Sequence, residues 1–119
     1  MSTPSRKLEH IDIVLTHEVE GPGTTWLEHV HLIHRAIPEI NFEDVELRMD
    51  FLGKKLRAPI IITGMTGGHR DVAHINRSLA EAVEEFGIAM GVGSQRAAIE
   101  DPSRIESFST ARKVAPNAV

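Results

Sequence analysis

Two consecutive segments of the chain have the same organisation, and this repetition most constrains its fold. The first segment, 60–87, starts with an unbroken apolar run, passes through a glycine-rich loop and continues as an amphipathic stretch that we expect Asp71 to cap and Gly87 to end. One helical stripe of that stretch contains Val72, Ile75, Leu79, Val83 and Phe86. A strand that is apolar on both faces is typical of a parallel sheet covered by helices.

The second segment repeats this order. Residues 88–92 form another apolar run, residues 93–96 form a second loop, and Asp101-Pro102 is expected to open a helix that carries Ile105 and Phe108. Alternating strands and helices imply parallel strands, in either a doubly wound sheet or a closed barrel.

The residues before this repeat have a different character. Residues 1 to about 10 are polar and basic, which predicts a mobile arm. Thr25 and Glu28 have capping-box spacing, which predicts a short helix over about 25–34. Apolar and charged residues alternate over 45–51, which predicts a strand that turns back through Gly53 into a hairpin. We therefore divide the single partial domain into residues 1–58 and residues 59–119.

Composition excludes several classes of function. The chain of 119 residues is 41% hydrophobic and 25% charged, as in an ordinary globular domain, and its lack of cysteine excludes disulfides and thiolate chemistry within it. A formal charge of -4 and 4% aromatic residues argue against nucleic-acid binding. Because no run could span a bilayer and no secretory signal is visible, we predict a cytoplasmic protein without a membrane partner.

The two loops are the candidate ligand site, since ligands of parallel α/β folds bind at the carboxyl ends of strands. Gly64, Gly67 and Gly68 allow close backbone approach, while Thr66 and Ser94 offer hydroxyl groups. The alternative is that these glycines only make tight turns. Neither loop carries a dinucleotide-binding or Walker A motif.

A few cations could bind an anion despite the acidic composition. Arg6, Lys7 and His10 lie together near the start, and Arg96 follows the second apolar run. Guanidinium and ammonium groups together suit a diphosphate, although each could equally be an idle surface charge. The histidines of the 25–34 segment have no recognisable metal-binding spacing, and we interpret them as surface residues: His29, His31 and His34.

The ordered set of motifs resembles a known family. Arg6-Lys7 with His10, Thr63-Gly-Met-Thr-Gly-Gly68, Gly91-Val-Gly-Ser-Gln-Arg96 and Arg112-Lys-Val-Ala-Pro116 are similar in order and spacing to type 2 isopentenyl diphosphate isomerase. The resemblance extends from Arg6 to Val119. It implies a (β/α)8 TIM barrel, to which this chain contributes an N-terminal arm, a hairpin and the first two β/α units.

The resemblance also implies an activity and its components. The family interconverts isopentenyl diphosphate and dimethylallyl diphosphate with FMN, using NAD(P)H as reductant and Mg2+, in homo-oligomers such as tetramers or octamers. It assigns FMN contacts to Thr63, Gly64, Met65, Thr66 and Ser94. It assigns substrate contacts to Arg6, Lys7, His10, Ser94, Gln95 and Arg96. No catalytic or metal-binding residue is expected in this segment, so the segment alone is expected to be inactive.

Two alternatives remain open from the sequence. Another FMN-dependent barrel, such as a 2-hydroxy acid oxidase or an inosine monophosphate dehydrogenase-like enzyme, uses similar strand-end glycines but does not need the Arg6, Lys7 and His10 group. A non-catalytic half-barrel that acts in assembly would self-associate through its exposed sheet edge.

Overall fold

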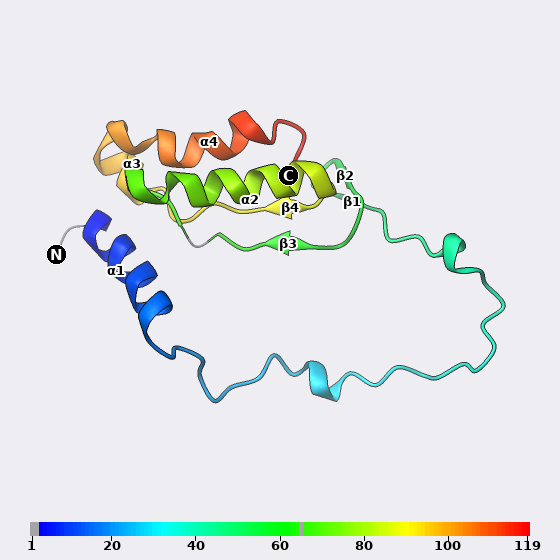
Figure 1. Cartoon of the computed structure of the whole chain (residues 1–119). Coiled ribbons are helices and arrows are strands. Elements are labelled where there is room, and N and C mark those ends of the chain that lie inside the picture. Colours follow the sequence, from blue (N-terminus) through cyan, green and yellow to red (C-terminus); the bar gives the residue numbers. More distant parts are fainter. Residues whose placement is uncertain (1–2, 65) are drawn as a thin grey trace.

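A computed structural model describes residues 3–64 and 66–119 of the chain. Its body has two layers, a short parallel sheet and a pair of helices that cover one face of it (Figure 1). The sheet pairs β3 with β4 in parallel, with Ile61 opposite Ala89 and Ile62 opposite Met90. The elements of the body are β3 (Ile61–Ile62), α2 (Ala73–Phe86), β4 (Ala89–Met90), α3 (Arg96–Glu100) and α4 (Glu106–Val114). The predicted mixture of helices with parallel strands is therefore confirmed for this part of an α/β fold.

Backbone pairing between the two strands continues past their formal ends. The Gly91 N–H donates to the Ile62 carbonyl at 2.8 Å, and the Gly93 N–H donates to the Thr66 carbonyl at 2.8 Å. The two loops that follow the strands are thus held side by side.

Small residues allow the two long helices and the sheet to pack closely. The core cluster contains Ala80, Val83, Ala111, Ala115 and Ala118, with Ile62, Ile88, Met90, Val92 and Val114 packed against it. The buried stripe of α2 differs from the predicted one, since Phe86 is 61% exposed. The polar Asn76 takes a buried place on that stripe instead.

A capped 3-10 turn leads into α2, and a glycine ends the helix. A 3-10 turn over Arg70–Val72 precedes the helix, and the His69 ring Nδ1 accepts a hydrogen bond from the Asp71 N–H at 3.1 Å. The expected capping role of Asp71 is therefore wrong: it follows the cap. Gly87 ends the helix with a φ of 64°, as predicted, because glycine adopts the left-handed conformation without steric cost.

The second unit contains one helix more than expected. The short α3 follows the second loop, and Asp101 then caps a 3-10 turn over Pro102–Arg104 by accepting from the Ser103 N–H at 3.0 Å. The helix start expected at Asp101-Pro102 is thus a 3-10 turn that leads into α4.

The predicted hairpin is present but short. It consists of β1 (Met49–Phe51) and β2 (Lys54–Leu56), with Met49 opposite Leu56. Leu52 and Gly53 have φ values of 49° and 78°, and two successive positive values match the twist of a two-residue hairpin turn. The strand expected over 45–51 begins only at Met49.

The described N-terminal residues are helical rather than a mobile arm, which corrects the prediction for residues 3–10, while residues 1–2 lie outside the described residues. Helix α1 spans Thr3–Thr16 and lies beside α3 (Figure 1). Lys7, Leu8 and Ile11 are half-buried on one face of α1. Their helical spacing gives the segment a face that packs, which basic composition alone did not reveal.

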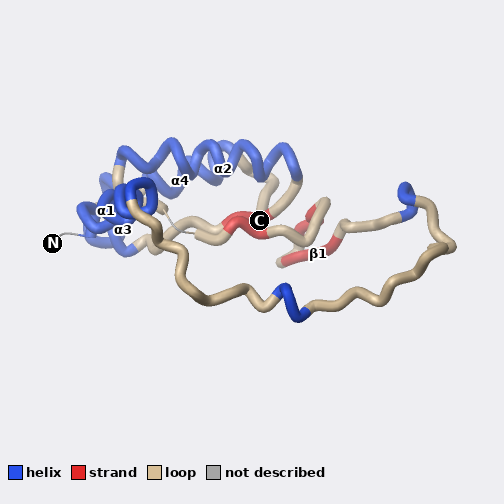
Figure 2. Tube along the Cα trace, turned by 60° about the horizontal axis from the view of Figure 1, so that its bottom comes forward, coloured by secondary structure: helices blue, strands red, loops and turns tan. Residues whose placement is uncertain are grey.

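Residues 17–48 form a long extended segment that bows away from the body (Figure 2). The helix predicted over 25–34 is wrong, since only a 3-10 turn over Leu27–His29 forms. Ile33 is 92% exposed, and Val30 is also exposed. A short helix is marginal in water unless a face packs, and no such face is buried here. No helix in the described residues is long and apolar enough to cross a membrane.

Candidate functional site

The candidate site lies at the carboxyl ends of β3 and β4. Both strands lead into their loops at the end of the sheet where α3 follows, and α1 lies against α3 at this same end (Figures 1 and 2). The fold therefore brings three predicted groups of residues to one edge of the sheet. They are the first loop (residues 63–68), the second loop (residues 93–96) and the turn of α1 that carries Arg6 and Lys7. This is the edge at which parallel α/β folds bind ligands.

The first loop presents bare backbone on its outside and is anchored on its inside. Thr63 and Gly64 are exposed at the end of β3. Thr66 is half-buried, and its hydroxyl donates to the Asn76 side-chain oxygen at 2.5 Å. Met65, which the resemblance assigns to the cofactor, lies outside the described residues.

Close packing within the protein explains most of the glycines in the loops. A methyl group on Gly64 would lie 2.3 Å from the Val92 carbonyl oxygen, and one on Gly93 would lie 2.5 Å from that of Thr66. Gly67 is buried against the Phe108 ring, which a methyl group would approach to 2.1 Å. The tight-turn interpretation therefore accounts for these positions without a ligand. Gly64 alone of the three also leaves exposed backbone at the strand end.

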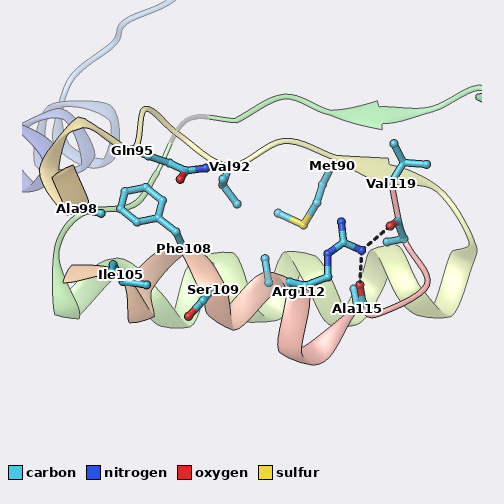
Figure 3. Close-up of a pocket in the computed structure, with 12 residues that line it drawn as sticks. Met90, Val92, Gln95, Ala98, Ile105, Phe108, Ser109, Arg112, Ala115 and Val119 are labelled. Atoms are coloured by element: carbon cyan, nitrogen blue, oxygen red, sulfur yellow. Dashed lines mark hydrogen bonds between the residues drawn. The ribbon is translucent and has the colours of Figure 1, made fainter. Parts of the chain in front are cut away.

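The second loop carries polar side chains that face solvent. Ser94, Gln95 and Arg96 are all exposed, and the Ser94 hydroxyl oxygen accepts from the Arg96 N–H at 3.4 Å. Gln95 also borders a groove of about 330 Å³ between β4 and α4, together with Phe108 and Arg112 (Figure 3). The Arg112 guanidinium donates to the Ala118 carbonyl at 2.7 Å, so it is engaged in holding the C-terminal turn.

The predicted cations remain available for a ligand. On α1, Arg6 and His10 are exposed and Lys7 is half-buried, while Arg96 begins α3. Within residues 3–64 and 66–119, none of these four forms an ion pair with a carboxylate. Unpaired guanidinium and ammonium groups on adjacent helices fit an anionic ligand such as a phosphate or diphosphate.

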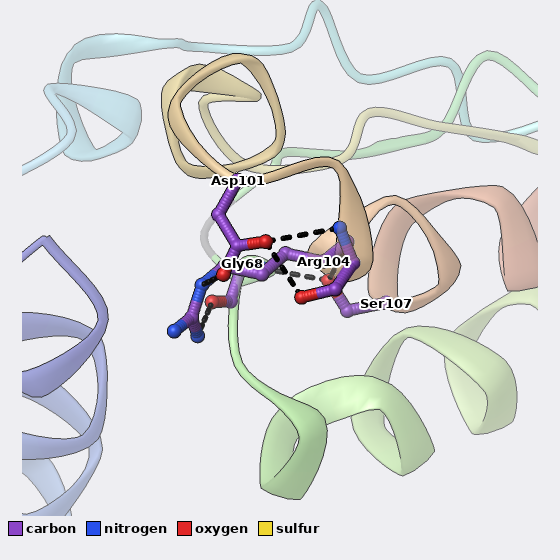
Figure 4. A network of polar contacts seen from close by, with 5 residues as sticks. Gly68, Asp101, Arg104 and Ser107 are labelled. Carbon is purple, nitrogen blue, oxygen red and sulfur yellow. Dashed lines mark hydrogen bonds and ion pairs between the residues drawn. The ribbon is translucent and has the colours of Figure 1, made fainter.

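A polar network beneath the first loop was not anticipated from the sequence (Figure 4). The Arg104 guanidinium donates to the Asp101 carboxylate at 3.0 Å and to the Gly68 carbonyl at 3.1 Å. The Gly68 N–H donates to the buried Ser107 hydroxyl at 2.8 Å. Both polar groups of the Gly68 backbone are therefore satisfied by the 101–107 segment, which fixes the end of the loop. In the sequence, the only indication of this network is the group of polar residues directly after Asp101-Pro102.

Hydrogen bonding also perturbs the carboxylate of this network. The Ser103 hydroxyl donates to Asp101 at 2.7 Å, and this bond is the main cause that lowers the pKa of Asp101, followed by the Ser103 N–H and by Arg104. Asp101 is therefore an anion that serves the network rather than a proton donor at neutral pH.

The histidines of the extended segment are not aligned on a helix. His29 lies in the 3-10 turn, and His31 and His34 lie in irregular chain, so the helical spacing that could have aligned them is absent. Among the described residues, no group of three or more histidine, aspartate or glutamate side chains is placed to hold a metal ion.

The site's residues suit a ligand that combines a flat group with an anion. Hydrogen-bond donors and acceptors without bulky side chains are offered by the exposed backbone of Thr63 and Gly64 and by the Ser94 hydroxyl. The basic residues of α1 and α3 lie at the same end of the sheet. The fold and the site together define a class of protein, a parallel β/α unit with cations and exposed backbone at its strand ends.

Comparison with known proteins makes this class specific. No protein-family profile matches the chain. The chain is 57% identical over 116 residues to an isopentenyl-diphosphate delta-isomerase of Aeropyrum pernix, an alignment that covers 98% of this chain and 31% of the relative. Identity is 53% to the protein of that name in Metallosphaera sedula and 54% to the one in Archaeoglobus fulgidus, each over 99% of this chain and covering 32% and 34% of the relative.

The chain is thus a homologue, over nearly its whole length, of part of the proteins named isopentenyl-diphosphate delta-isomerase. The resemblance inferred from the motifs is confirmed to that extent. The chain spans about a third of the length of these curated relatives.

Proposed function

We propose that this chain is the N-terminal third of a type 2 isopentenyl diphosphate isomerase, which interconverts isopentenyl diphosphate and dimethylallyl diphosphate. The observation that carries the proposal is the 57% identity across 98% of the chain to a protein named for that reaction. The gathering of the Arg6 helix and the Arg96 helix at the strand ends supports it. The rest of the (β/α)8 barrel, a homo-oligomer and the NAD(P)H and Mg2+ requirements are parts of the same proposal.

In this proposal the strand ends hold FMN. Thr63, Gly64 and Thr66 of the first loop and Ser94 of the second would contact it, and Met65 joins them by resemblance. When bound in its reduced form, FMN supplies a proton donor and acceptor for an alkene that no ordinary side chain protonates well.

The chain's own residues contribute binding and orientation. Arg6, Lys7 and Arg96 would bind the diphosphate, with His10 beside them and Gln95 next to the substrate. Diphosphate contacts are remote from the reacting carbons, so their binding energy can hold the alkene in a reactive position. No residue of this chain is assigned a proton transfer, and the chain alone is proposed to be inactive.

The experiment that tests the proposal is a chimera. The matching segment of the Aeropyrum pernix relative is replaced by this chain, and isopentenyl diphosphate isomerisation is measured with reduced FMN. Activity within about tenfold of the unaltered relative is expected, since tenfold corresponds to only about 1.4 kcal/mol of transition-state stabilisation. A folded, FMN-loaded chimera without isomerase activity would contradict the proposal.

A matched pair of arginine variants tests the diphosphate contact. Arg96→Ala in the chimera is expected to raise KM for the diphosphate by about 10- to 100-fold, as loss of a charge-assisted contact costs about 1.5–3 kcal/mol. Arg77→Ala is the control, because Arg77 lies on α2 and pairs with Glu81 at 3.0 Å. Equal effects of the two substitutions would show that only net charge matters.

A further inference from the structure

The buried amide of Asn76 joins the first loop at Thr66 to the helix layer behind it, in addition to the contacts that Ser107 and Arg104 make with Gly68. Asn76 lies in α2 and is 2% exposed. Ala80 and Val83 follow it on the same buried side of the helix. An amide in such surroundings costs free energy unless its hydrogen bonds are made within the protein.

Asn76 uses its acceptor and its donor group toward two different segments. Its side-chain oxygen accepts from the Thr66 hydroxyl at 2.5 Å. Its side-chain nitrogen donates to the Ser107 carbonyl at 2.9 Å and to the Thr66 carbonyl at 3.4 Å. The amide therefore bridges the first loop and α4.

Thr66 passes this constraint on to the second loop. The Thr66 carbonyl that faces Asn76 also accepts the Gly93 N–H at 2.8 Å. Gly93 directly precedes Ser94, the second-loop residue assigned to both cofactor and substrate. The position of Ser94 relative to the first loop thus depends on the orientation of the Thr66 peptide, which Asn76 fixes from behind.

Replacing Asn76 alone by an apolar side chain of similar size would fill the same space, but the Thr66 hydroxyl would lose its acceptor and the Ser107 carbonyl would lose the amide donor. Removing one member of a buried hydrogen-bonded pair costs free energy. An apolar residue also could not hold Thr66 in one orientation.

We infer that Asn76 is a positioning residue for the ligand site: through Thr66 it sets the spacing between the two strand-end loops that would contact FMN. This inference rests on the proposed function. Asn76 touches neither cofactor nor substrate in it. Asn76 instead affects how well ordered the two loops are and how tightly they would bind FMN.

The test compares Asn76→Ala with Val83→Ala. Val83 is buried on the same helix, two turns further on and within the core cluster, so its truncation destabilises the fold without touching the loops. Two readouts are taken: amide hydrogen exchange of Gly93 relative to Ala80 in the 119-residue chain, and FMN affinity of the chimera described above.

In the Asn76→Ala protein, Gly93 exchange is expected to accelerate at least about tenfold more than Ala80 exchange, since exchange reports local opening. The Kd for FMN should rise at least about tenfold. In Val83→Ala, both amides should change alike and the Kd should stay within about twofold. The inference is overturned if the two variants behave alike at equal loss of thermal stability.

Failure of the proposed function gives a different result. If the unsubstituted chimera is folded but binds no FMN, the proposed function fails, and the cofactor part of this inference fails with it. The exchange comparison still decides whether Asn76 orders the two loops, because that readout needs no ligand.

Discussion

Replacing Gly67 by alanine should be among the most damaging single-methyl changes in this chain. The new methyl group would lie 2.1 Å from a carbon of the Phe108 ring, which is itself only 6% exposed and cannot swing into solvent. Overpacking of a core costs about 1–3 kcal/mol. The φ of 136° at Gly67 adds a backbone strain of about 1–3 kcal/mol for any other residue. The two terms together predict a loss of about 2–6 kcal/mol in the free energy of unfolding.

Three other glycines separate these terms. Gly23 has open space and no positive φ, so Gly23→Ala should change stability by less than about 1 kcal/mol. Gly53 has open space but a φ of 78°, which predicts a strain cost of about 1–2 kcal/mol alone. Gly93 has no positive φ but would place its methyl group 2.5 Å from the Thr66 carbonyl oxygen, which predicts an overpacking cost of about 1–3 kcal/mol alone.

Urea unfolding followed by far-ultraviolet circular dichroism measures all four variants on one scale, with a shared slope as evidence that the unfolded states are alike. Phe108→Leu provides the cross-check, since a smaller side chain should relieve the clash and make the double variant with Gly67→Ala less unstable than the sum of the two single changes. The reasoning is refuted if Gly67→Ala falls within about 0.5 kcal/mol of Gly23→Ala, the range of ordinary surface changes.

Two further predictions concern the network under the first loop. Ser107→Ala should lower the free energy of unfolding in urea by about 1–3 kcal/mol, because the buried Gly68 N–H loses its acceptor. The control, Ser109→Ala on the same helix, should change it by less than about 0.5 kcal/mol. Equal losses of stability in the two variants would contradict the assigned hydrogen bond. Asp101→Asn should destabilise the fold at neutral pH. This deficit should begin to shrink below about pH 3.9, the ordinary aspartate pKa, and vanish once the pH has fallen through the lower pKa of folded Asp101. The deficit decreases on acidification because hydrogen bonding from Ser103 lowers the pKa of folded Asp101, so that the stabilising anion is fully present only above the unfolded pKa. A stability deficit of Asp101→Asn that grew at low pH would refute this reasoning.

Local patterns predicted the parts of the fold whose stabilising contacts are close in sequence. The Gly87 helix end, the Gly53 turn and the parallel strands at Ile61 and Ala89 were all predicted, because each follows from a residue's own conformational preference or from a short apolar run. The role of His69 as cap of the 3-10 turn before α2 was missed, since a histidine ring is an uncommon cap.

The errors concern segments whose structure depends on distant contacts. Residues 3–16 form a helix that lies against α3, about 90 residues later in the sequence, and a basic composition gave no indication of that surface. Conversely, the spacing of Leu27, Val30 and Ile33 predicted a helix that has nothing to pack on. Periodicity indicates which face could be buried, but only the tertiary structure determines whether it is.

The candidate site shows the same division between local and distant information. The resemblance named residues of both loops and of the N-terminal segment, and the structure places all of their elements at one sheet edge. It could not reveal Asn76, because a lone asparagine in an amphipathic stretch looks like a solvent-facing residue until Thr66 and Ser107 are seen on either side of it. Residues that would touch a ligand can therefore be proposed from motifs, whereas residues that hold those motifs in place become visible only when packing is known. For this chain the distinction has a practical consequence. Under the proposed function, substitutions at Arg96 should alter substrate binding, while substitutions at Asn76 should alter the arrangement of the two loops proposed to hold FMN.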